Sequence, residues 1–440
     1  MGAFCAANFF ARGGGTVRRT MWVSLIACLA LATLTQYAFK ASAATVRTGA
    51  VAAAPPSASS LGLLAIGTGQ EQHLGDVRRY KYVILQSWHA DIVTSIHTRS
   101  PSTKVLTYLE GAATQFQTCS SNAPTSYAQW NSAPINYCWI VAHHPDWLLR
   151  DRAGRIIRFV DYPSLVAVDV ANKAYQALWM HNAMALAHQG GYAGVYFDDV
   201  SMAPTHGMAG QMAKYTDQQY GEAMSSFGSI VGDHLRAAGF LAVANTGVDP
   251  WVAWQSAAAL RMAPHLSMMV REFSVHWGGE CGSQSPVFTD PSSNGDPDLS
   301  TIHSFRIAVE RLGTAIGGID YSSGQLSASD LATMQYGRAS FLLTWNGRLG
   351  SAYFFRTCGT VDPANPAWTI DPGTPVGAME GSQGMWSRPF SRGLVLLNPS
   401  PTQTVTYHLP SSVVYRDIHR NIVTGLITMP PRSASVLTTN

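Results

Sequence analysis

The stretch Gly190-Gly-Tyr-Ala-Gly-Val-Tyr-Phe-Asp-Asp-Val-Ser201 decides how the rest of the chain is interpreted. Its two glycines end the preceding helical segment, and the β-prone run Val195–Phe197 follows. Two carboxylates, Asp198 and Asp199, come directly after that run. Because an isolated carboxylate is costly to bury, such residues belong where a strand emerges into a cleft. We therefore interpret Asp198 as the tip of a buried parallel strand and the centre of a functional site.

Apolar β-type runs alternate with helical patterns on both sides of this stretch. Strand-like runs are expected at 82–88, 104–111, 165–170, 194–200, 240–246, 266–274, 314–321 and 349–356. The clearest helical pattern covers 174–188, which Asn172 can cap and Gly190 can end. Strict alternation predicts a parallel sheet, and eight units predict a closed (β/α)8 barrel of the TIM type. A doubly wound open sheet is the alternative, but no glycine-rich phosphate motif follows the first strand.

Composition divides the chain into four parts. Residues 1–43 are interpreted as a signal peptide or membrane anchor, and 44–60, rich in Ala, Pro and Ser, as a linker. The barrel domain is expected over 61–376. From about residue 377 to 440, short β runs separated by Pro, Ser and Asn predict a small all-β, sandwich-like domain.

The N-terminal segment has the pattern of an export signal. Arg18 and Arg19 precede an apolar run from Met21 to about Leu34, and Ala41-Ser42-Ala43 offers a cleavage site. This pattern predicts a secreted or periplasmic protein. An uncleaved membrane anchor and a lipoprotein signal at Cys28 are the alternatives. The formal charge of +3 comes from this segment, and the nearly neutral remainder does not indicate nucleic-acid binding.

Composition and cysteine content agree with export. Charged residues make up 12% of the sequence, about half the usual share. Beyond residue 43 the chain has four cysteines, an even number that predicts two disulfides in an exported protein. We expect Cys119 to pair with Cys138, and Cys281 with Cys358. These spacings do not fit a zinc site, which needs Cys or His ligands two to four residues apart, and no metal is expected.

A second strand-like run also ends in charge, Met268-Met269-Val270-Arg271-Glu272. Two carboxylates facing each other across a cleft are the minimal set for hydrolysing a glycosidic bond. One acts as nucleophile or base, and the other protonates the leaving oxygen. We expect Asp198 to be the nucleophile or base and Glu272 the proton donor, with Glu110 and Asp320 as fallback acids.

In a barrel, the residues that follow the strand C-termini meet at one mouth. The side chains expected to bind substrate there are Trp88, Glu110, Asp199, Asn245, Arg271, Trp277, Asp320 and Tyr321. Aromatic rings among them can stack on sugars, and Arg271 can bind hydroxyls or keep a carboxylate ionised. Asp199 is expected to point away from Asp198, because neighbours on a strand face opposite sides.

Each assignment has a structural alternative. Asp198 and Asp199 could be Ca²⁺ ligands or a helix cap, and Glu272 could form a salt bridge. Most Trp side chains are core residues, and Asn245 could cap the next element. No Gly-x-Ser-x-Gly elbow or His-Glu-x-x-His motif occurs, so esterase and zinc protease functions lack support. A metal-dependent polysaccharide deacetylase would need His ligands near Asp198, and the sequence offers no convincing set.

Three segments resemble hypothetical glycoside hydrolase family 15, a group of secreted bacterial barrel enzymes related to the polygalactosaminidase family 114. The segments are His144–Leu148 with Asp151 and Gly154, Val168–Asn172 with Tyr175, and Gly191–Asp199. The family pattern ends in an Asp that falls on Asp198, whereas Ala193 stands where the family often has Asp. Pro430–Ala434 also resembles the β-sandwich that closes many such barrels.

The resemblance and the paired carboxylates together predict a secreted glycosidase that acts on a poly- or oligosaccharide without a cofactor. The alternative is a non-catalytic carbohydrate-binding surface protein on the same scaffold, since fold does not fix function. No protein partner is implied, and a membrane is involved only if the N-terminal segment stays uncleaved.

Overall fold

The computed structural model describes residues 61–66, 74–119, 125–126, 132–272, 276–277, 287–288, 299–321, 328–356, 365–382 and 384–439. The expected export signal, the linker, Cys281 and Cys358 lie outside these residues. Over the ranges that are described, no helix combines the length and apolar character needed to cross a membrane.

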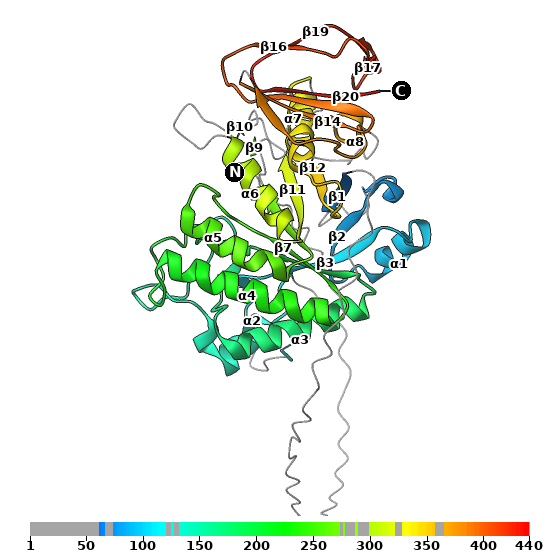
Figure 1. The fold of residues 1–440 in the computed structure, drawn as a ribbon. Coiled ribbons are helices and arrows are strands. Elements are labelled where there is room, and N and C mark those ends of the chain that lie inside the picture. The colour runs from blue at the N-terminus through cyan, green and yellow to red at the C-terminus, as the bar shows by residue number, and fades with distance from the viewer. Residues whose placement is uncertain are drawn as a thin grey trace, which may run out of the picture. The chain divides into compact units, whose positions relative to one another are not determined.

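Eight parallel strands form a closed barrel (Figure 1). In spatial order they are β1 (Gly62–Ile66), β12 (Ala352–Arg356), β11 (Ala315–Tyr321), β8 (Met268–Glu272), β7 (Leu241–Asn245), β6 (Gly194–Asp198), β3 (Lys104–Glu110) and β2 (Tyr82–Gln86). Strand β1 pairs with β2 on one side and with β12 on the other, which closes the ring. The predicted (β/α)8 barrel is confirmed, and an open doubly wound sheet is excluded.

One of the predicted barrel strands is wrong. Residues 165–170 contribute only β5 (Leu165–Ala167), which pairs antiparallel with β4 (Ala113–Gln115) outside the barrel. The missing barrel strand is β1, whose sequence Gly-Leu-Leu-Ala-Ile is a short apolar run without alternation. Periodicity alone cannot assign such a run to a strand. Because the two errors offset each other, Asp198 still ends the fourth barrel strand along the chain and Glu272 the sixth.

Helices follow most of the barrel strands. They are α1 (Ala90–Arg99), α3 (Lys173–Gln189), α4 (Asp217–Ala237), α5 (Ala253–Met262), α6 (Leu299–Arg311) and α7 (Ala328–Thr344). Shorter helical elements are η2 (Val77–Arg79), α2 (Tyr137–His143), η3 (Pro145–Trp147), η4 (Ala263–His265) and α8 (Pro366–Thr369). Asn172 caps α3 as predicted, accepting hydrogen bonds from the backbone amides of Ala174 and Tyr175.

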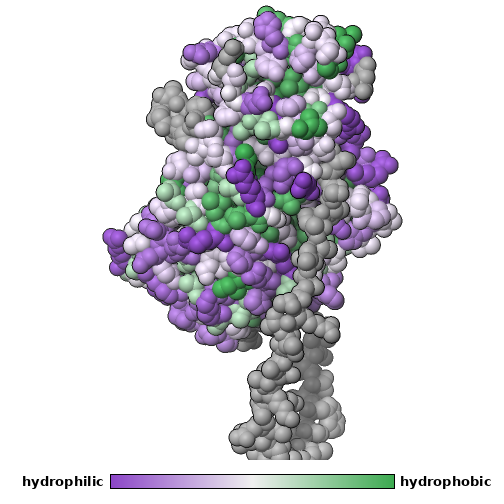
Figure 2. Space-filling model, in the orientation of Figure 1, coloured by the Kyte–Doolittle hydropathy of each residue, from purple (hydrophilic) through white to green (hydrophobic). Residues whose placement is uncertain are grey.

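Helix α4 shows how sequence places a helix on the barrel. Thr216 and Gln219 form a reciprocal capping box at its start. Apolar residues then recur every three or four positions and are buried: Tyr220, Met224, Phe227, Val231 and Leu235. Hydrophilic side chains predominate on the outer surface of α4 and α5 (Figure 2). This pattern fixes which side of the helix packs against the strands.

Strand β6 carries Asp198 to the end of the barrel. It begins with Gly194 because a Cβ there would lie 2.3 Å from the carbonyl oxygen of Leu241 on β7. Tyr196 faces the barrel interior, where its ring stacks on that of Tyr108 with centroids 5.8 Å apart. Phe197 faces outward, since its ring meets Trp179 of α3 edge-on. Side chains alternate along a strand, so Asp198 shares the interior side of Tyr196.

The C-terminal part is built from antiparallel sheets. A six-stranded sheet has the order β13 (Glu380–Ser382), β14 (Met385–Phe390), β15 (Gly393–Asn398), β20 (Ser433–Thr438), β17 (Tyr415–Arg416) and β18 (Ile422–Val423). A second sheet pairs β16 (Val405–His408) with β19 (Leu426–Met429). A small apolar cluster that includes Leu396, Leu409, Met429 and Leu437 packs between them. The predicted sandwich-like all-β region is confirmed. One further hairpin, β9 (His276–Trp277) with β10 (Val287–Phe288), follows β8.

Arg388 on β14 connects this sheet to helix α7. Its Nη1 atom donates to the carbonyl oxygens of Leu342 at 3.2 Å, Leu343 at 2.8 Å and Trp345 at 2.7 Å. The last carbonyls of a helix have no partner within the helix, and a cation is favoured there. The guanidinium therefore caps the C-terminal end of α7.

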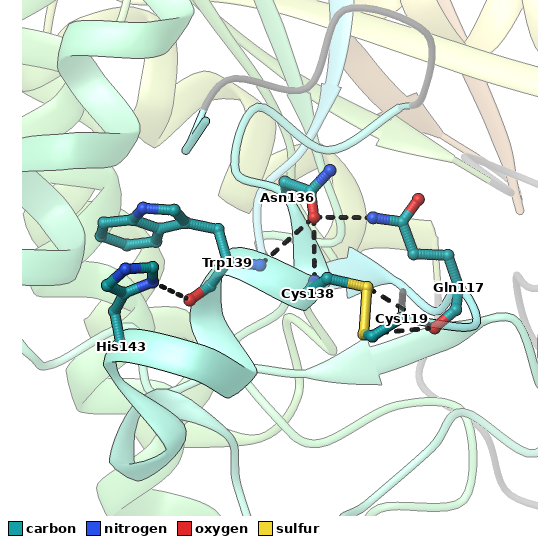
Figure 3. Close-up of a disulfide and its surroundings, with 6 residues drawn as sticks. All are labelled: Gln117, Cys119, Asn136, Cys138, Trp139 and His143. Carbon is teal, nitrogen blue, oxygen red and sulfur yellow. Dashed lines mark hydrogen bonds between the residues drawn. A yellow bond between two sulfur atoms is a disulfide. The ribbon is translucent and has the colours of Figure 1, made fainter. Parts of the chain in front are cut away.

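A long excursion between β3 and α3 contains the disulfide shown in Figure 3. Cys119 and Cys138 are bonded, as predicted from the sequence. Asn136 caps α2 by accepting hydrogen bonds from the amides of Cys138 and Trp139, and Gln117 Nε2 donates to the same oxygen at 2.6 Å. The disulfide and the cap together fix the start of α2.

Candidate active site

The two predicted catalytic carboxylates meet at one side chain. Asn245, the last residue of β7, donates from Nδ2 to Asp198 Oδ1 at 2.7 Å and to Glu272 Oε2 at 3.0 Å. Asp198 ends β6 and Glu272 ends β8, the two neighbours of β7 in the barrel. Both carboxylates are half-buried, whereas Asn245 is buried. The three side chains thus form a row across the carboxyl ends of adjacent strands, with the amide between the acids.

Asp198 receives two more hydrogen bonds. The Tyr108 hydroxyl donates to Oδ2 at 2.5 Å, and the backbone amide of Asp199 donates to Oδ1 at 2.9 Å. Burial and the charge of Asp199 raise the pKa of Asp198 to about 6, although these hydrogen bonds and the one from Asn245 oppose the rise. Burial, followed by the charges of Asp198 and Glu110, raises the pKa of Tyr108 well above its usual value. Tyr108 therefore remains a donor, and its hydrogen bond favours the ionised form of Asp198.

Asp199 leaves the strand in an uncommon backbone conformation. Its φ is +56°, in the left-handed region that side chains with a Cβ rarely adopt. Its carboxylate does not join the row of Asp198, Asn245 and Glu272. Instead, Oδ1 lies 3.1 Å from Nε2 of His206, in the loop after β6.

Glu110 lies beneath Asp199 and is inaccessible. Its side chain is 1% exposed, and Oε1 accepts a hydrogen bond from the amide of Ala112 at 3.2 Å. Burial first, and then the charges of Asp199 and Asp198, raise the pKa of Glu110 well above its ordinary value. A carboxyl this enclosed offers no accessible surface to a sugar hydroxyl. Asp320 is enclosed as well, with 0% of its side chain exposed. Contact of Glu110 and Asp320 with substrate stays a prediction.

The remaining predicted ligands are spread around the same end of the barrel. Trp88 is half-buried in the turn after β2. Arg271 is half-buried, and its Nε donates to the carbonyl oxygen of Val248 at 3.3 Å. Burial lowers the pKa of Arg271, while the charges of Asp249 and Asp320 oppose that effect. Trp277 belongs to β9 and Tyr321 ends β11, but their side chains lie outside the described structure.

Two residues of this site were not predicted from the sequence. Tyr108 carries a usable signal, since it lies two positions before Glu110 on a strand and therefore shares its side. His206 lies in an irregular loop where neither spacing nor composition marks it. Asp169, near the end of the run 165–170 that was predicted as a barrel strand, is buried and accepts hydrogen bonds from Lys214 Nζ at 2.5 Å and Tyr215 Oη at 2.6 Å.

Among the residues that the structure describes, no group of three or more His, Cys, Asp or Glu side chains is placed to hold a metal ion. The site as described offers carboxylates, an amide, a phenol and an imidazole.

The chain is similar to a known protein family in sequence and to known proteins in structure. Residues 97–263 match the sequence profile of hypothetical glycosyl hydrolase family 15. No curated protein sequence matches the chain. The structure is similar to the glycoside hydrolase domain of PelA from Pseudomonas aeruginosa, with 15% identity, a TM-score of 0.42, and coverage of 68% of this chain and 95% of that one.

Two amylases are also similar in structure. The noncanonic maltogenic α-amylase AmyB from Thermotoga neapolitana has 10% identity and a TM-score of 0.49, covering 86% of this chain and 99% of that one. The α-amylase from Geobacillus thermoleovorans has 11% identity and a TM-score of 0.45, with 86% and 98% covered. The barrel rests on the strand topology of the chain itself. Over residues 97–263, which include Asp198, the resemblance to hypothetical glycosyl hydrolase family 15 is confirmed.

Proposed function

We propose that this protein is a glycoside hydrolase that cleaves O-glycosidic bonds of a poly- or oligosaccharide through Asp198 and Glu272. The observation that carries the proposal is the position of Asn245, whose amide nitrogen binds both carboxylates. Two half-buried acids held this close at the end of a barrel are costly for stability and suited to glycoside hydrolysis. The family match supports the class of reaction, although it ends before Glu272.

Asp198 is the better nucleophile of the two. It accepts hydrogen bonds from a phenol, an amide side chain and a backbone amide, all of which favour its ionised form. With a pKa of about 6 it is a carboxylate at neutral pH. Glu272, two strands away around the barrel, is then the acid that protonates the leaving oxygen.

The shared donor also bears on stereochemistry. Two oxygens bound to one nitrogen cannot lie farther apart than the sum of the two bonds, about 5.7 Å, and amide hydrogens about 120° apart place them nearer to about 5 Å. Retaining glycosidases have carboxyl groups about 5–5.5 Å apart, whereas inverting enzymes leave about 6.5–9.5 Å for a water. We infer a retaining reaction.

In that reaction the Asp198 carboxylate attacks the anomeric carbon, and the bond to the leaving oxygen breaks as Glu272 transfers its proton to that oxygen. Glu272, now ionised, removes a proton from a water that attacks the same carbon. The ester to Asp198 then breaks, which returns both residues to their starting states. Trp88, Arg271, Trp277 and Tyr321 remain the proposed sugar contacts.

We also propose that the protein acts outside the cytoplasm. The proposal rests on the signal-like pattern of residues 1–43 and is supported by the Cys119–Cys138 disulfide, since disulfides persist in oxidising compartments. Cell fractionation with N-terminal sequencing of the mature chain would test it. A product that begins near residue 44 is expected, and a full-length cytoplasmic chain would contradict the proposal.

The function is tested by hydrolysis of a polysaccharide panel that includes amino-sugar polymers, with Asp198→Asn and Glu272→Gln beside the parent. We expect each variant to lose activity by about 10³-fold or more while melting no lower than the parent. Asp233→Asn is a matched control, because Asp233 is an exposed carboxylate paired with His265 on the surface.

Different negative results would contradict different parts of the proposed function. Activity that survives in Asp198→Asn would remove Asp198 from the mechanism. An inverted anomer in the first product, seen by NMR, would contradict the retaining reaction alone. Saturable sugar binding without turnover on any substrate would favour the non-catalytic carbohydrate-binding protein.

A further inference from the structure

The backbone of Asp199 aims a hydrogen-bond donor at the proposed nucleophile. Because φ of Asp199 is +56°, the chain turns sharply at the end of β6, and the Asp199 amide donates to Asp198 Oδ1 at 2.9 Å. A left-handed conformation is unfavourable for a residue with a Cβ, although Asp tolerates it better than most. Such strain persists only where surrounding contacts hold it, and those contacts are identifiable here.

His206 holds the Asp199 side chain from the other side. Its Nε2 lies 3.1 Å from Asp199 Oδ1, and its Nδ1 lies 3.3 Å from Asp161 Oδ2. Asp161 belongs to the segment just before β5, so the imidazole joins two loops that flank the site. Each ring nitrogen faces a carboxylate oxygen, which can only accept a hydrogen bond. Both nitrogens must therefore donate, and only the protonated imidazolium can do so.

The surroundings of His206 keep its ring in this place. The ring stacks on Phe159 with centroids 4.8 Å apart, and Tyr162 meets it edge-on at 5.2 Å. The His206 carbonyl accepts a hydrogen bond from the amide of Val160 at 2.9 Å. The side chains of His206 and Asp199 are 19% and 18% exposed, whereas that of Asp161 is 66% exposed. The pair with Asp199 is thus the better shielded of the two.

The charges around the ring decide when it is protonated. Among the described residues, the titratable groups that face it are Asp199 after β6 and Asp161 and Tyr162 before β5, with Glu110 of β3 behind Asp199. Burial lowers the pKa of His206, but its bonds and charge interactions with Asp199 and Asp161 outweigh burial and raise the pKa above 6.5. Because the bridging form is the protonated one, it is present below that pKa and lost as pH rises through it.

We propose that protonated His206 is a positioning residue, which bridges Asp199 and Asp161 and thereby holds the Asp199 amide on the Asp198 carboxylate. The effect on turnover rests on the proposed function, whereas the bridge itself does not. When His206 loses its proton, one of its two bonds is lost and the turn at Asp199 relaxes. Turnover is therefore expected to fall on the alkaline side as His206 deprotonates.

An NMR titration tests the bridge without any substrate. The His206 ring resonances, assigned by their absence in His206→Gln, should titrate above pH 6.5 in the parent and at lower pH in Asp161→Asn. The Asp199 amide resonance should move with the same midpoint in the parent and stay displaced at all pH values in His206→Gln. A titration midpoint of His206 at or below pH 6.5 would overturn the proposal. So would an Asp199 amide resonance that does not shift as His206 titrates.

The second test is the pH dependence of kcat/KM. His206→Gln keeps polar contacts but cannot carry charge, so we expect a loss of about 10–100-fold, mainly in kcat, and an alkaline fall that reflects only the proton donor Glu272. His206→Arg keeps a permanent cation with several donors, and it should recover part of the activity and hold it to higher pH. A residue that served stability alone would not give this pattern.

The control for these variants is His265→Gln. His265 forms a similar pair with Asp233 at 2.9 Å, but in η4, which precedes β8 and so lies at the opposite end of the barrel from the site. The His265→Gln variant should therefore show the same pH dependence of kcat/KM as the parent. An active parent whose His206→Gln variant keeps both the parent kcat and the midpoint of the parent's alkaline fall refutes the positioning role. A parent inactive on every substrate refutes the proposed function. The NMR titration then still tests whether protonated His206 bridges Asp199 and Asp161.

Discussion

Tyr108 on β3 donates its hydroxyl hydrogen to Oδ2 of Asp198 on the neighbouring strand β6, at 2.5 Å. The contact follows from strand register, because Tyr108 pairs with Tyr196 and Glu110 pairs with Asp198 across the two strands. The phenol is thus a neutral donor that stabilises negative charge on Asp198 without adding charge of its own. Its removal should affect the ionisation of Asp198 more than the fold.

We expect Tyr108→Phe to lower kcat/KM by about 10–100-fold, since a hydrogen bond to a charged group contributes about 1.5–3 kcal/mol. The bond favours ionised Asp198, so its loss raises the pKa of Asp198 above about 6 and moves the acidic fall in activity to higher pH. A pH–rate profile measures both effects. Tyr215→Phe is the control, because its hydroxyl binds Asp169 instead. An unmoved acidic limb in Tyr108→Phe would contradict this role.

Asp198→Asn should be more stable than the parent at neutral pH. The pKa of Asp198 rises from 3.8 to about 6 on folding, so the folded state binds more protons between these values and the free energy of unfolding falls as pH increases through that window. Asn cannot ionise and avoids this loss, which is on the order of 2–3 kcal/mol above pH 6. Urea unfolding at pH 8 and pH 4 measures the difference. The gain should vanish at pH 4, and an equal gain at both pH values would show another cause.

Asn245→Ala removes the donor that the two carboxylates share. Without it, Asp198 and Glu272 lose a common restraint, and Asp198 loses a donor that favours its ionised form. We expect kcat/KM to fall by about 10–100-fold, with a small change in melting temperature. Asn182→Ala is a matched control, because this buried amide binds the carbonyl oxygens of Ser126 and Pro134 away from the carboxylates. The control should lose stability and keep activity, and the reverse result would refute the assignment.

The parts of this site that could be predicted are those set by local sequence pattern, whereas contacts between loops far apart in the chain could not be predicted. Asp198 and Glu272 each end an apolar run, and that local pattern is enough to place both at the carboxyl ends of parallel strands. The bridge through Asn245 requires the three strands to be neighbours, which the chain order of a barrel supplies. His206 and Asp161 meet only through the packing of two irregular loops, about which periodicity says nothing.

The fold was predictable for a similar reason, and its errors were local. Seven of the eight predicted strands are barrel strands, and their alternation with helices identifies the barrel even when one strand is placed wrongly. Residues 165–170 look like a barrel strand because Leu165–Val168 is apolar, yet Leu165–Ala167 pairs with β4 in the excursion after β3. The burial of Glu110 and Asp320 could not be predicted either, since a strand tip looks the same whether water reaches it or not.

Arg388→Met should weaken the attachment of the C-terminal sheet to helix α7. The guanidinium of Arg388 donates to three carbonyl oxygens near the end of that helix, and these would lose a charged partner. We expect unfolding to become easier by about 2–3 kcal/mol, with near-parental kcat for material that remains folded. Urea denaturation measures the change. Arg392→Met, which breaks an exposed pair with Asp371, is the control and should cost about 1 kcal/mol or less. Equal effects of the two substitutions would contradict the capping role.

The pairing of β1 with β12 joins residue 62 to residue 352. Ring closure is consequently the longest-range event in the folding of the barrel, and loop-closure entropy makes such contacts slow to form. A fragment limited to residues 97–263 would carry Asp198 on a sheet with two open edges, ready to pair with other chains. During synthesis, Asp198, Asn245 and Glu272 are all made well before the strand that completes their scaffold. The carboxylate pair is therefore assembled in a partly built barrel, whose exposed edges must be protected until the last strand arrives.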